Sequence, residues 1–204
     1  MNGVILLAAG QGTRFHGKKQ DMLFHEKPVW RYAYETALEV VEEANIIVVG
    51  KNIPGGATRT ESVRIGLSAL PDNVDRVIIV EAARPMVTKE QIHQLLEDPH
   101  PSSTLVRPLI NTVIYRDGTY VNRNELYDLL TPQAFNRKML QDAYDSNLFN
   151  DMTDETRVMF EFFGVKPHFI ETEANNLFKI TYPGDLDIID SIYKVQKANI
   201  NTHE

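Results

Sequence analysis

The chain has 204 residues, of which 43% are hydrophobic, enough for one domain with a sizeable core. Its net charge of −7 argues against a nucleic acid as the main partner, because nucleic-acid-binding proteins carry a basic surface. The absence of cysteine excludes disulfides and thiolate metal sites. No run approaches the roughly 18–20 apolar residues of a membrane span, and no signal peptide is apparent. We therefore expect a single domain over residues 1–204, in the cytoplasm and without a membrane contact.

The first half of the chain alternates buried strands with amphipathic helices. Continuous apolar runs predict strands at Val4–Ala8, Asn45–Val49 and Arg76–Val80. Apolar stripes at helical spacing predict helices at Pro28–Val41, Arg59–Leu70 and Thr88–Leu96, the last with a capping box. This order predicts an α/β, Rossmann-like fold, in which helices cover both faces of a mostly parallel sheet.

The second half departs from this alternation. A strand is expected at Ser103–Val106, followed by a β-hairpin or arm, because Asp117-Gly118 is a two-residue turn signal. A helix follows the segment Thr131–Phe135. The other expected elements are helices at Arg137–Tyr144, Asp154–Phe163 (capped by Thr153) and Pro183–Lys197, strands at His168–Glu171 and Phe178–Thr181, and a frayed tail at Ala198–Glu204.

Ligands of such sheets bind beyond the carboxyl ends of the strands, so three loops are expected to converge. These loops are Gly10–Gln20, Gly55–Ser62 and Glu81–Pro85. The first loop is not a Walker motif, which needs Gly-Lys-Ser/Thr at the right spacing. It is not a dinucleotide fingerprint either, because a third glycine and an acidic residue after the second strand are missing.

The loop after the first strand carries the strongest functional signal. Gly10 and Gly12 let a ligand approach the backbone closely, and Arg14, Lys18 and Lys19 add three cations. This set suits a triphosphate whose α-phosphorus is attacked, because the cations stabilise the charge that grows on the phosphoryl group and on the departing pyrophosphate. A tight turn with solvated charges is the alternative reading.

Several blocks of the sequence resemble the nucleotidyltransferases with a Rossmann-like fold. Within them, the likeness is to the 2-C-methyl-D-erythritol 4-phosphate cytidylyltransferases and their ribitol-5-phosphate cytidylyltransferase relatives. The blocks, which follow the order of the family, are Leu6-Leu-Ala-Ala-Gly-Gln-Gly-Thr-Arg14, Lys19-Gln20, Gly55-Gly56-Ala-Thr-Arg59-Thr-Glu-Ser62-Val-Arg-Ile-Gly66-Leu67, Ala82-Ala83-Arg84-Pro85, Thr131-Pro-Gln-Ala-Phe135, Thr153-Asp154-Glu155 and Lys179-Ile180-Thr181.

The resemblance implies a reaction in which CTP and the phosphate of a small alcohol give a CDP-alcohol and pyrophosphate, with Mg²⁺ bound to the phosphates. It also implies roles for single positions. These are Arg14 and Lys19 as catalytic cations, Ala8, Ala9, Gly10, Gly12, Gly56 and Ser62 at the nucleotide, and Arg84, Thr131, Thr153 and Lys179 at the second substrate. In the family, the residue matching Thr131 reaches the neighbouring subunit, so residues 111–128 are expected to form a β-arm for homodimerisation.

Departures from the family pattern leave two roles open. The spacing from Arg14 to Lys19 is two residues tighter than in the family, and Lys18 stands at the proline position. Lys18 is therefore an alternative catalytic cation. A short spacing is also seen in molybdenum-cofactor guanylyltransferases, so the base is not fixed as cytosine. Glu81 replaces an aspartate and is the candidate Mg²⁺ ligand, with a contact to the ribose or a plain surface charge as the alternatives. Only five residues separate Val49 from Gly55, where the family has a helix and a strand.

The alcohol also stays open. Ala-Ala-Arg-Pro and Thr-Asp-Glu favour 2-C-methyl-D-erythritol 4-phosphate, whereas Arg123-Asn124-Glu125 is similar to the ribitol branch, so ribitol 5-phosphate or another cell-surface polyol or phosphonate is the alternative. A nucleotide-binding relative without turnover is a second alternative, although the retained cations and Ser62 argue against it. The six histidines show no ligand spacing and are expected to be surface or half-buried residues.

Overall fold

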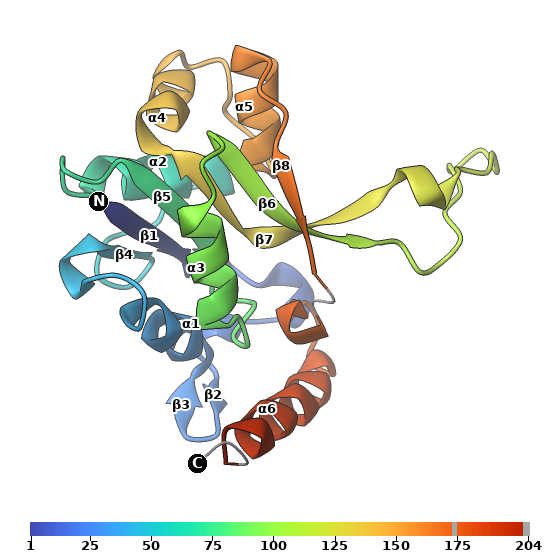
Figure 1. Ribbon diagram of the computed structural model, residues 1–204. Helices are drawn as coiled ribbons and strands as arrows, with labels where there is room; N and C mark the ends of the chain where they lie inside the picture. The colour runs from blue at the N-terminus through green and yellow to red at the C-terminus, as the bar shows by residue number, and fades with distance from the viewer. Residues whose placement is uncertain (173–174, 202–204) are drawn as a thin grey trace.

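The computed structural model describes residues 1–172 and 175–201, and in that part of the chain a six-stranded sheet forms the centre (Figure 1). The strand order is β4-β1-β5-β7-β6-β8. The strands are β1 (Asn2–Leu7), β4 (Ile46–Val49), β5 (Arg76–Glu81), β6 (Ser102–Pro108), β7 (Tyr127–Asn136) and β8 (His168–Glu171). All of them run parallel except β7, which is antiparallel to both of its neighbours. The predicted mostly parallel, Rossmann-like sheet is confirmed.

Helices cover both faces of this sheet, as predicted. The helices are α1 (Val29–Leu38), α2 (Arg59–Ala69), α3 (Lys89–Glu97), α4 (Arg137–Asp145), α5 (Glu155–Phe163) and α6 (Asp185–Asn201). One face packs against α1 and α3, and the other packs against α2, α4 and α5. No described helix is both long enough and apolar enough to cross a membrane.

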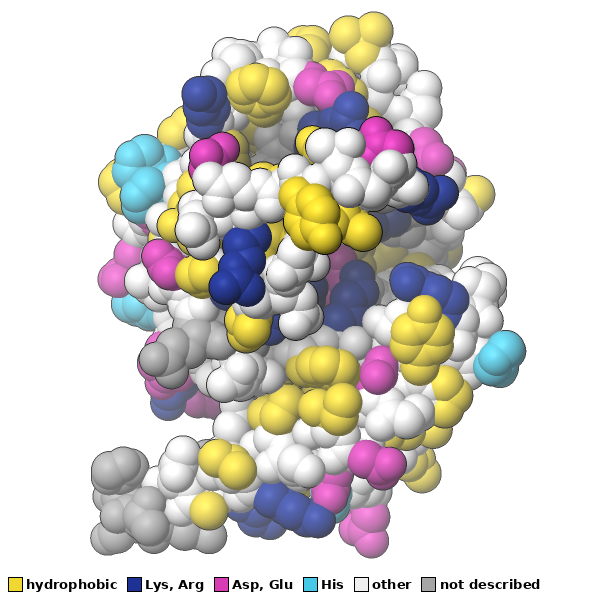
Figure 2. All heavy atoms as spheres, turned by 90° about the vertical axis from the view of Figure 1, so that its right-hand side faces the viewer, with side chains coloured by type: hydrophobic (Ala, Val, Ile, Leu, Met, Phe, Trp, Pro, Cys, Tyr) yellow, Lys and Arg dark blue, Asp and Glu magenta, His cyan; other side chains and the backbone are white. Residues whose placement is uncertain are grey.

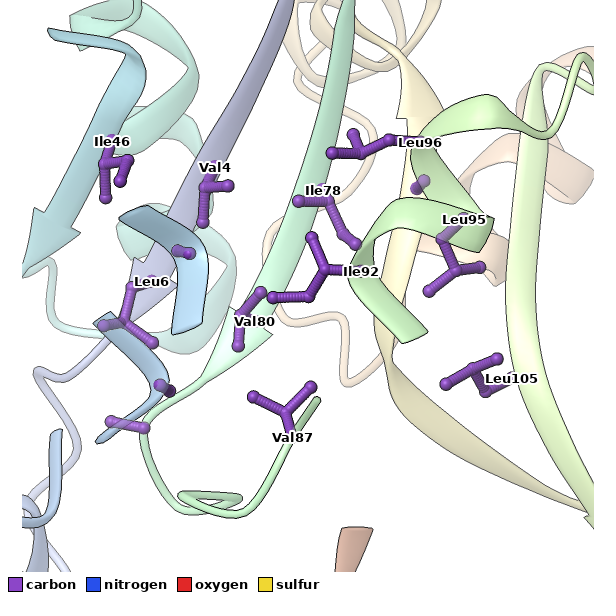
Figure 3. Close-up of a cluster of buried hydrophobic side chains, with 14 of the residues drawn as sticks. Val4, Leu6, Ile46, Ile78, Val80, Val87, Ile92, Leu95, Leu96 and Leu105 are labelled. Carbon is purple, nitrogen blue, oxygen red and sulfur yellow. The ribbon is translucent and has the colours of Figure 1, made fainter. Parts of the chain in front are cut away.

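Alternate side chains of β1 and β5 fill two separate layers of the core. Val4 and Ile78 point toward α1 and α3, where Figure 3 shows them among other aliphatic side chains. Ile5 and Ile79 point the other way, toward α2 and α4. All four side chains are fully buried, which explains why these strands read as continuous apolar runs. Gly66 lets α2 approach β1, because a Cβ there would lie 2.6 Å from a methyl group of Ile5.

A third apolar cluster joins α6 to the main body. A short hairpin of β2 (Leu23–Phe24) and β3 (Lys27–Pro28) precedes α1. Phe24 from this hairpin, Tyr32 from α1 and Ile189 from α6 are buried together. The C-terminal helix therefore packs on the segment that follows the glycine loop, at the same end of the molecule as the carboxyl ends of the parallel strands (Figure 1).

The segment Thr131–Phe135 leads into α4, as predicted, but the long strand β7 that contains it was missed. Three other details of the sequence prediction were wrong. Phe178–Thr181 is not a strand, and its contact with the body is a hydrogen bond from the Ile180 N–H to the Ala83 carbonyl at 2.8 Å. The cap of α5 is Asp154 instead of Thr153. Finally, α6 continues through the first residues of the expected frayed tail, and 202–204 lie outside the described residues.

The expected arm projects from the sheet between β6 and β7 (Figure 1). Its tip is a hairpin, in which Ile114 pairs with Tyr120 and the Tyr115 N–H donates to the Thr119 carbonyl at 2.8 Å. The turn falls at Asp117-Gly118, as predicted, with a positive φ of 90° at the glycine. The predicted range of 111–128 is slightly too long, because its last two residues belong to β7.

Candidate active site

Three loops converge at the carboxyl edge of the parallel strands and line one cavity of about 360 Å³. Leu7 at the end of β1 pairs with Val49 on one side and with Glu81 on the other, so the three strands end level with one another. The predicted convergence is confirmed. The sequence-predicted residues that line the cavity are Ala8, Ala9, Gly10, Lys19, Gly56, Ser62, Glu81 and Lys179. From the side of the arm, Lys and Arg side chains are visible in a hollow near the middle of the surface (Figure 2).

The glycine loop is compact because its own backbone groups close it. Gly12 has a φ of 63°, and a Cβ at this position would lie 1.8 Å from the Gly17 carbonyl oxygen. The side chain of Gln20 donates to the Gly10 carbonyl at 3.0 Å. Arg14 lies in the 3-10 turn between Gly12 and Gly17, and its side chain is exposed. Any side chain larger than hydrogen at Gly12 would therefore force this loop to open.

The second loop presses against the first. A Cβ at Gly55 would lie only 2.2 Å from the Cβ of Ala9, so this contact requires glycine. The Gly56 N–H donates to the Ser62 hydroxyl at 3.1 Å, and this hydroxyl donates to the Thr58 carbonyl at 3.0 Å. Both groups lie at the start of α2, where they offer polar atoms to the cavity wall.

Glu81 places an anion among the cations of the cavity. Its side chain is 12% exposed and forms an ion pair with Lys179, while the Arg59 Nε lies 3.7 Å from its Oε1. Burial opposes ionisation of Glu81, but Lys179 and Arg59 outweigh it and hold the pKa of this carboxyl below its usual value. The carboxyl of Glu81 is therefore an ionised oxygen donor. Mg²⁺ is typically held by one or two carboxylates together with substrate phosphates, so this donor fits it.

Lys19 and Lys18 point into different spaces. The Lys19 ammonium donates to the Ile180 carbonyl and lines the cavity described above. Burial, with a smaller effect from the nearby Lys179, lowers the pKa of Lys19. Lys18 instead lines a neighbouring cavity of about 390 Å³, together with Asp21 and Lys51. Of the two candidate catalytic lysines, Lys19 is the one that faces Glu81 and Lys179.

The residues predicted for the second substrate are only partly brought together. Arg84 donates through its Nε to the Thr131 hydroxyl at 2.8 Å and through a terminal nitrogen to the Leu177 carbonyl. Thr131 lies in β7, is 6% exposed and bonds its own chain, so it does not extend from the arm as expected. Neither residue lines the cavity, and Thr153 lies apart in the exposed loop before α5.

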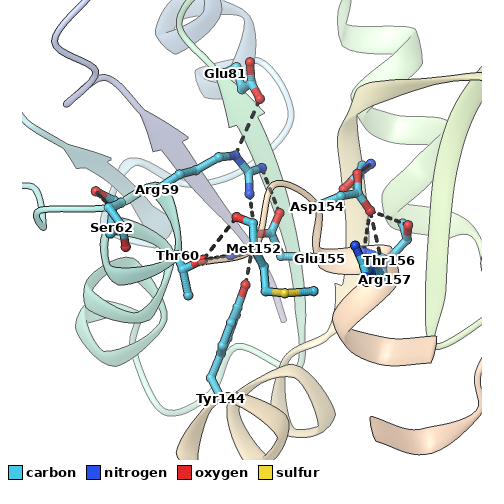
Figure 4. A network of polar contacts seen from close by, with 12 residues as sticks. Arg59, Thr60, Ser62, Glu81, Tyr144, Met152, Asp154, Glu155, Thr156 and Arg157 are labelled. Atoms are coloured by element: carbon cyan, nitrogen blue, oxygen red, sulfur yellow. Dashed lines mark hydrogen bonds and ion pairs between the residues drawn. The ribbon is translucent and has the colours of Figure 1, made fainter. Parts of the chain in front are cut away.

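A buried network beside the cavity was not predicted (Figure 4). Arg59 donates to both oxygens of Glu155, at 2.5 and 2.8 Å, and the Tyr144 hydroxyl donates to the same carboxylate at 3.0 Å. Glu155 is fully buried. Burial would lower the pKa of Arg59, but the carboxylate more than compensates and raises it. Arg59 and Glu155 both lie in the blocks quoted above, so those blocks were the available signal.

A glycine loop, cations and a carboxylate at the carboxyl edge of a mostly parallel sheet define a nucleotide-binding α/β enzyme of the transferase class. The model of the family "2-C-methyl-D-erythritol 4-phosphate cytidylyltransferase" matches residues 3–194, and the chain belongs to this family. The enzyme of that name from Clostridium botulinum is 29% identical over 94% of this chain and 96% of its own length. The one from Chromobacterium violaceum is 32% identical over 91% and 94%.

Solved structures agree with this assignment. The bifunctional IspDF from Campylobacter jejuni superposes with a TM-score of 0.80 at 29% identity, covering 93% of this chain and 54% of that longer protein. The 4-diphosphocytidyl-2C-methyl-D-erythritol synthase from Anaerococcus prevotii gives a TM-score of 0.76 at 25% identity, covering 95% and 98%. The recognition of the family from the sequence blocks is thus confirmed.

Proposed function

We propose that the chain transfers CMP from CTP to 2-C-methyl-D-erythritol 4-phosphate, releasing pyrophosphate and a CDP-alcohol. The observation that carries this proposal is the single cavity that joins the glycine loop, Lys19, Glu81 and Lys179, in a chain that belongs to the cytidylyltransferase family. A reaction that consumes CTP and a soluble alcohol phosphate takes place in the cytoplasm, which is where we place this protein.

In the proposed reaction, a phosphate oxygen of the alcohol attacks the α-phosphorus of CTP in line with the leaving group. One P–O bond forms, and the bond from the α-phosphorus to the bridging oxygen of pyrophosphate breaks. The attacking oxygen is already anionic, so no general base is needed. Arg14 and Lys19 stabilise the charge on the transferred and departing phosphates, and no covalent intermediate with the protein forms.

The cavity wall is proposed to hold the nucleotide. The backbone of Ala8, Ala9 and Gly10 would lie beside base and ribose. Gly56 and Ser62 would read the hydrogen-bonding edge of cytosine. Two backbone or hydroxyl groups at fixed positions are enough to separate cytosine from other bases, because a wrong base leaves a buried polar group unpaired. The close packing of Gly55 on Ala9 would help to hold these groups in position.

The second substrate is proposed to lie toward β7. Lys179 and Arg84 would bind the phosphate of the alcohol, and Thr131 would hold Arg84 through the hydrogen bond at 2.8 Å. Thr153 does not line the cavity and is exposed in the loop before α5. We therefore propose that Thr153 helps to hold the loop before α5 and does not contact the substrate.

A release assay for pyrophosphate tests the activity directly. Each nucleoside triphosphate is paired with 2-C-methyl-D-erythritol 4-phosphate, ribitol 5-phosphate and a polyol phosphonate, in the presence of Mg²⁺. We expect the highest kcat/KM for CTP with 2-C-methyl-D-erythritol 4-phosphate. A higher value for ribitol 5-phosphate would reassign the alcohol, and binding of CTP without release of pyrophosphate from any pair would refute the enzymatic reading.

Mg²⁺ is proposed to bind the phosphates of CTP together with Glu81, which would neutralise the charge of the triphosphate. Replacing Glu81 with alanine should raise the Mg²⁺ concentration at half-maximal rate by about tenfold or more, because one anionic ligand is lost. Glu81→Asp, which restores the residue of the family, is the matched control and should retain most of the wild-type response. Equal Mg²⁺ curves for wild type and Glu81→Ala would exclude Glu81 as a ligand.

The arm of residues 109–126 is proposed to pair with a second copy of the chain. It carries unusually exposed apolar side chains, with Ile110 and Tyr120 at 80% and 78% exposure. Wild type should sediment as a dimer at micromolar concentration, and Tyr120→Asp should shift it toward monomer. Leu148→Asp, which changes an apolar side chain 71% exposed outside the arm, should leave the dimer intact. A purely monomeric wild type would contradict this role of the arm.

A further inference from the structure

Two histidines and an aspartate meet at the amino-terminal edge of the sheet, opposite the edge that carries the cavity. Asp98 and His100 lie in the loop between α3 and β6, and His168 is the first residue of β8. Parallel pairing of β6 with β8 sets Ser103 against His168, which brings the loop and the edge strand together. His168 is far from Asp98 and His100 in the sequence, so spacing alone does not reveal the cluster. Both histidines are exposed, which agrees with the expectation of surface or half-buried histidines.

The donor atoms of this cluster already face one another. The His168 Nδ1 lies 2.6 Å from the Asp98 Oδ2, and the His100 Nδ1 lies 3.0 Å from the Asp98 Oδ1. One ligand atom from each residue lies within 4.8 Å of the others. The two imidazole rings stack with centroids 4.0 Å apart and planes inclined by 22°. The three residues therefore offer donor atoms within reach of a single ion.

The aspartate is the fixed part of the cluster. Its side chain is only 7% exposed, and the His100 backbone N–H donates to its Oδ1 at 3.0 Å. Burial opposes ionisation of Asp98, but hydrogen bonds from His100 and His168 outweigh it and keep the pKa of this carboxyl below its usual value. The two rings, by contrast, are 51% and 44% exposed, so solvent reaches them.

One cation faces the cluster. Arg76 at the start of β5 has a terminal nitrogen 4.0 Å from the Asp98 Oδ1. Its guanidinium is occupied by hydrogen bonds to the Leu95 and His100 carbonyls and to the Ser103 hydroxyl, at 2.8 to 3.1 Å. The hydrogen bonds from Arg76 to the Leu95 and His100 carbonyls tie β5 to the backbone of this loop.

We propose that Asp98, His100 and His168 form a Zn²⁺ site. Two imidazole nitrogens and one carboxylate oxygen are a typical three-residue donor set for this ion, and water completes the tetrahedron. In each neutral imidazole, the proton that faces Asp98 moves from Nδ1 to Nε2, and the metal takes its place on Nδ1. Mg²⁺ prefers oxygen ligands, so the ion of the proposed reaction does not compete here.

Bound Zn²⁺ would link the edge strand β8 to the loop before β6. This link lies at the opposite edge of the sheet from Glu81 and Lys19, so the site is structural and does not rest on the proposed cytidylyl transfer. We expect the ion to stabilise the fold by binding only its native state. The midpoint of thermal unfolding should therefore rise when Zn²⁺ is added to wild type.

The test uses the full chain without an affinity tag, titrated with Zn²⁺ against a competing chromogenic chelator in the presence of Mg²⁺. We expect one tight Zn²⁺ per chain. His100→Ala and His168→Ala should each weaken binding by about tenfold or more. His93→Ala is the matched control, because His93 is an exposed histidine on α3 whose ring faces a single carboxylate, Glu97, at 3.1 Å. It should bind Zn²⁺ like wild type.

Two further readouts keep the outcome decisive. Substituted Co²⁺ should give the strong visible absorption of a four-coordinate ion in wild type and in His93→Ala, and should lose it in His168→Ala. Circular dichroism confirms that each variant is folded. If wild type bound Zn²⁺ no more tightly than His168→Ala, or if Co²⁺ stayed octahedral in wild type, the metal site would be refuted.

Discussion

Replacing Lys19 with alanine should lower kcat/KM by about 10²–10³-fold and leave the stability of the fold nearly unchanged. Lys19 lines the cavity together with Glu81 and Lys179. There its positive charge can stabilise the negative charge of the departing pyrophosphate. Steady-state kinetics with CTP and 2-C-methyl-D-erythritol 4-phosphate, together with urea unfolding, measures both effects.

Lys18→Ala is the matched control, since Lys18 is the adjacent lysine but lines the neighbouring cavity. It should lose much less activity than Lys19→Ala. The reverse order, with Lys18→Ala inactive and Lys19→Ala near wild type, would show that the roles of the two lysines are exchanged in the tightened loop.

The pH profile gives an independent check on Lys19. Burial and Lys179 lower the pKa of Lys19, so its positive charge is lost at a lower pH than for an exposed lysine. The rate should therefore decline on the alkaline side, and Lys19→Arg should move this decline to higher pH, because a guanidinium stays protonated. An unchanged alkaline limb in Lys19→Arg would assign the decline to another group.

Replacing Glu155 with alanine should lower the free energy of unfolding by about 3–5 kcal/mol, because the buried charge of Arg59 would lose its partner. Glu155 is fully buried and accepts hydrogen bonds from Arg59 and from Tyr144. Urea unfolding monitored by circular dichroism measures the loss. Removing the acceptor also leaves the Tyr144 hydroxyl without this partner, which adds to the cost.

An exposed ion pair supplies the control for Glu155. Glu35 pairs with Lys27 on the surface of the molecule, where solvent screens the charges, so Glu35→Ala should leave the stability nearly unchanged. A double substitution, Arg59→Met with Glu155→Leu, should recover part of the stability lost in Glu155→Ala, since no charge is then buried alone. Equal stability of Glu155→Ala and wild type would show that Arg59 is solvated in solution.

The sequence allowed the prediction of those elements whose signal is local. β1, β4 and β5 were predicted because strands buried on both faces form continuous apolar runs. The capping box of α3 was predicted and is present, with Thr88 and Gln91 bonded reciprocally. The strand β7 was missed because Pro132 and several polar residues interrupt its apolar pattern. Its pairing with β5 depends on residues that are distant in the sequence.

The sequence predicted which loops form the candidate site, but only some of the contacts between their side chains. Gly10, Lys19, Ser62 and Glu81 follow strands whose ends must meet, so their convergence followed from topology. The orientation of Thr131 and the pairing of Arg59 with Glu155 depend on how β7 and α5 pack, which no local pattern encodes. The cluster at Asp98 is hidden for the same reason, because β8 brings His168 to it only in the folded chain.

The segment from Leu177 to Ile180 lies outside the sheet and contacts two cations of the site. Its Leu177 carbonyl accepts from Arg84, and its Ile180 carbonyl accepts from Lys19, so one short segment holds cations from two separate loops. The two carbonyls hold both side chains in place before a phosphate binds. The long side chains then lose less conformational entropy when the phosphate binds. If Lys19 and Arg84 bind the nucleotide and the alcohol as proposed, one short segment outside the sheet sets the relative position of the two substrates.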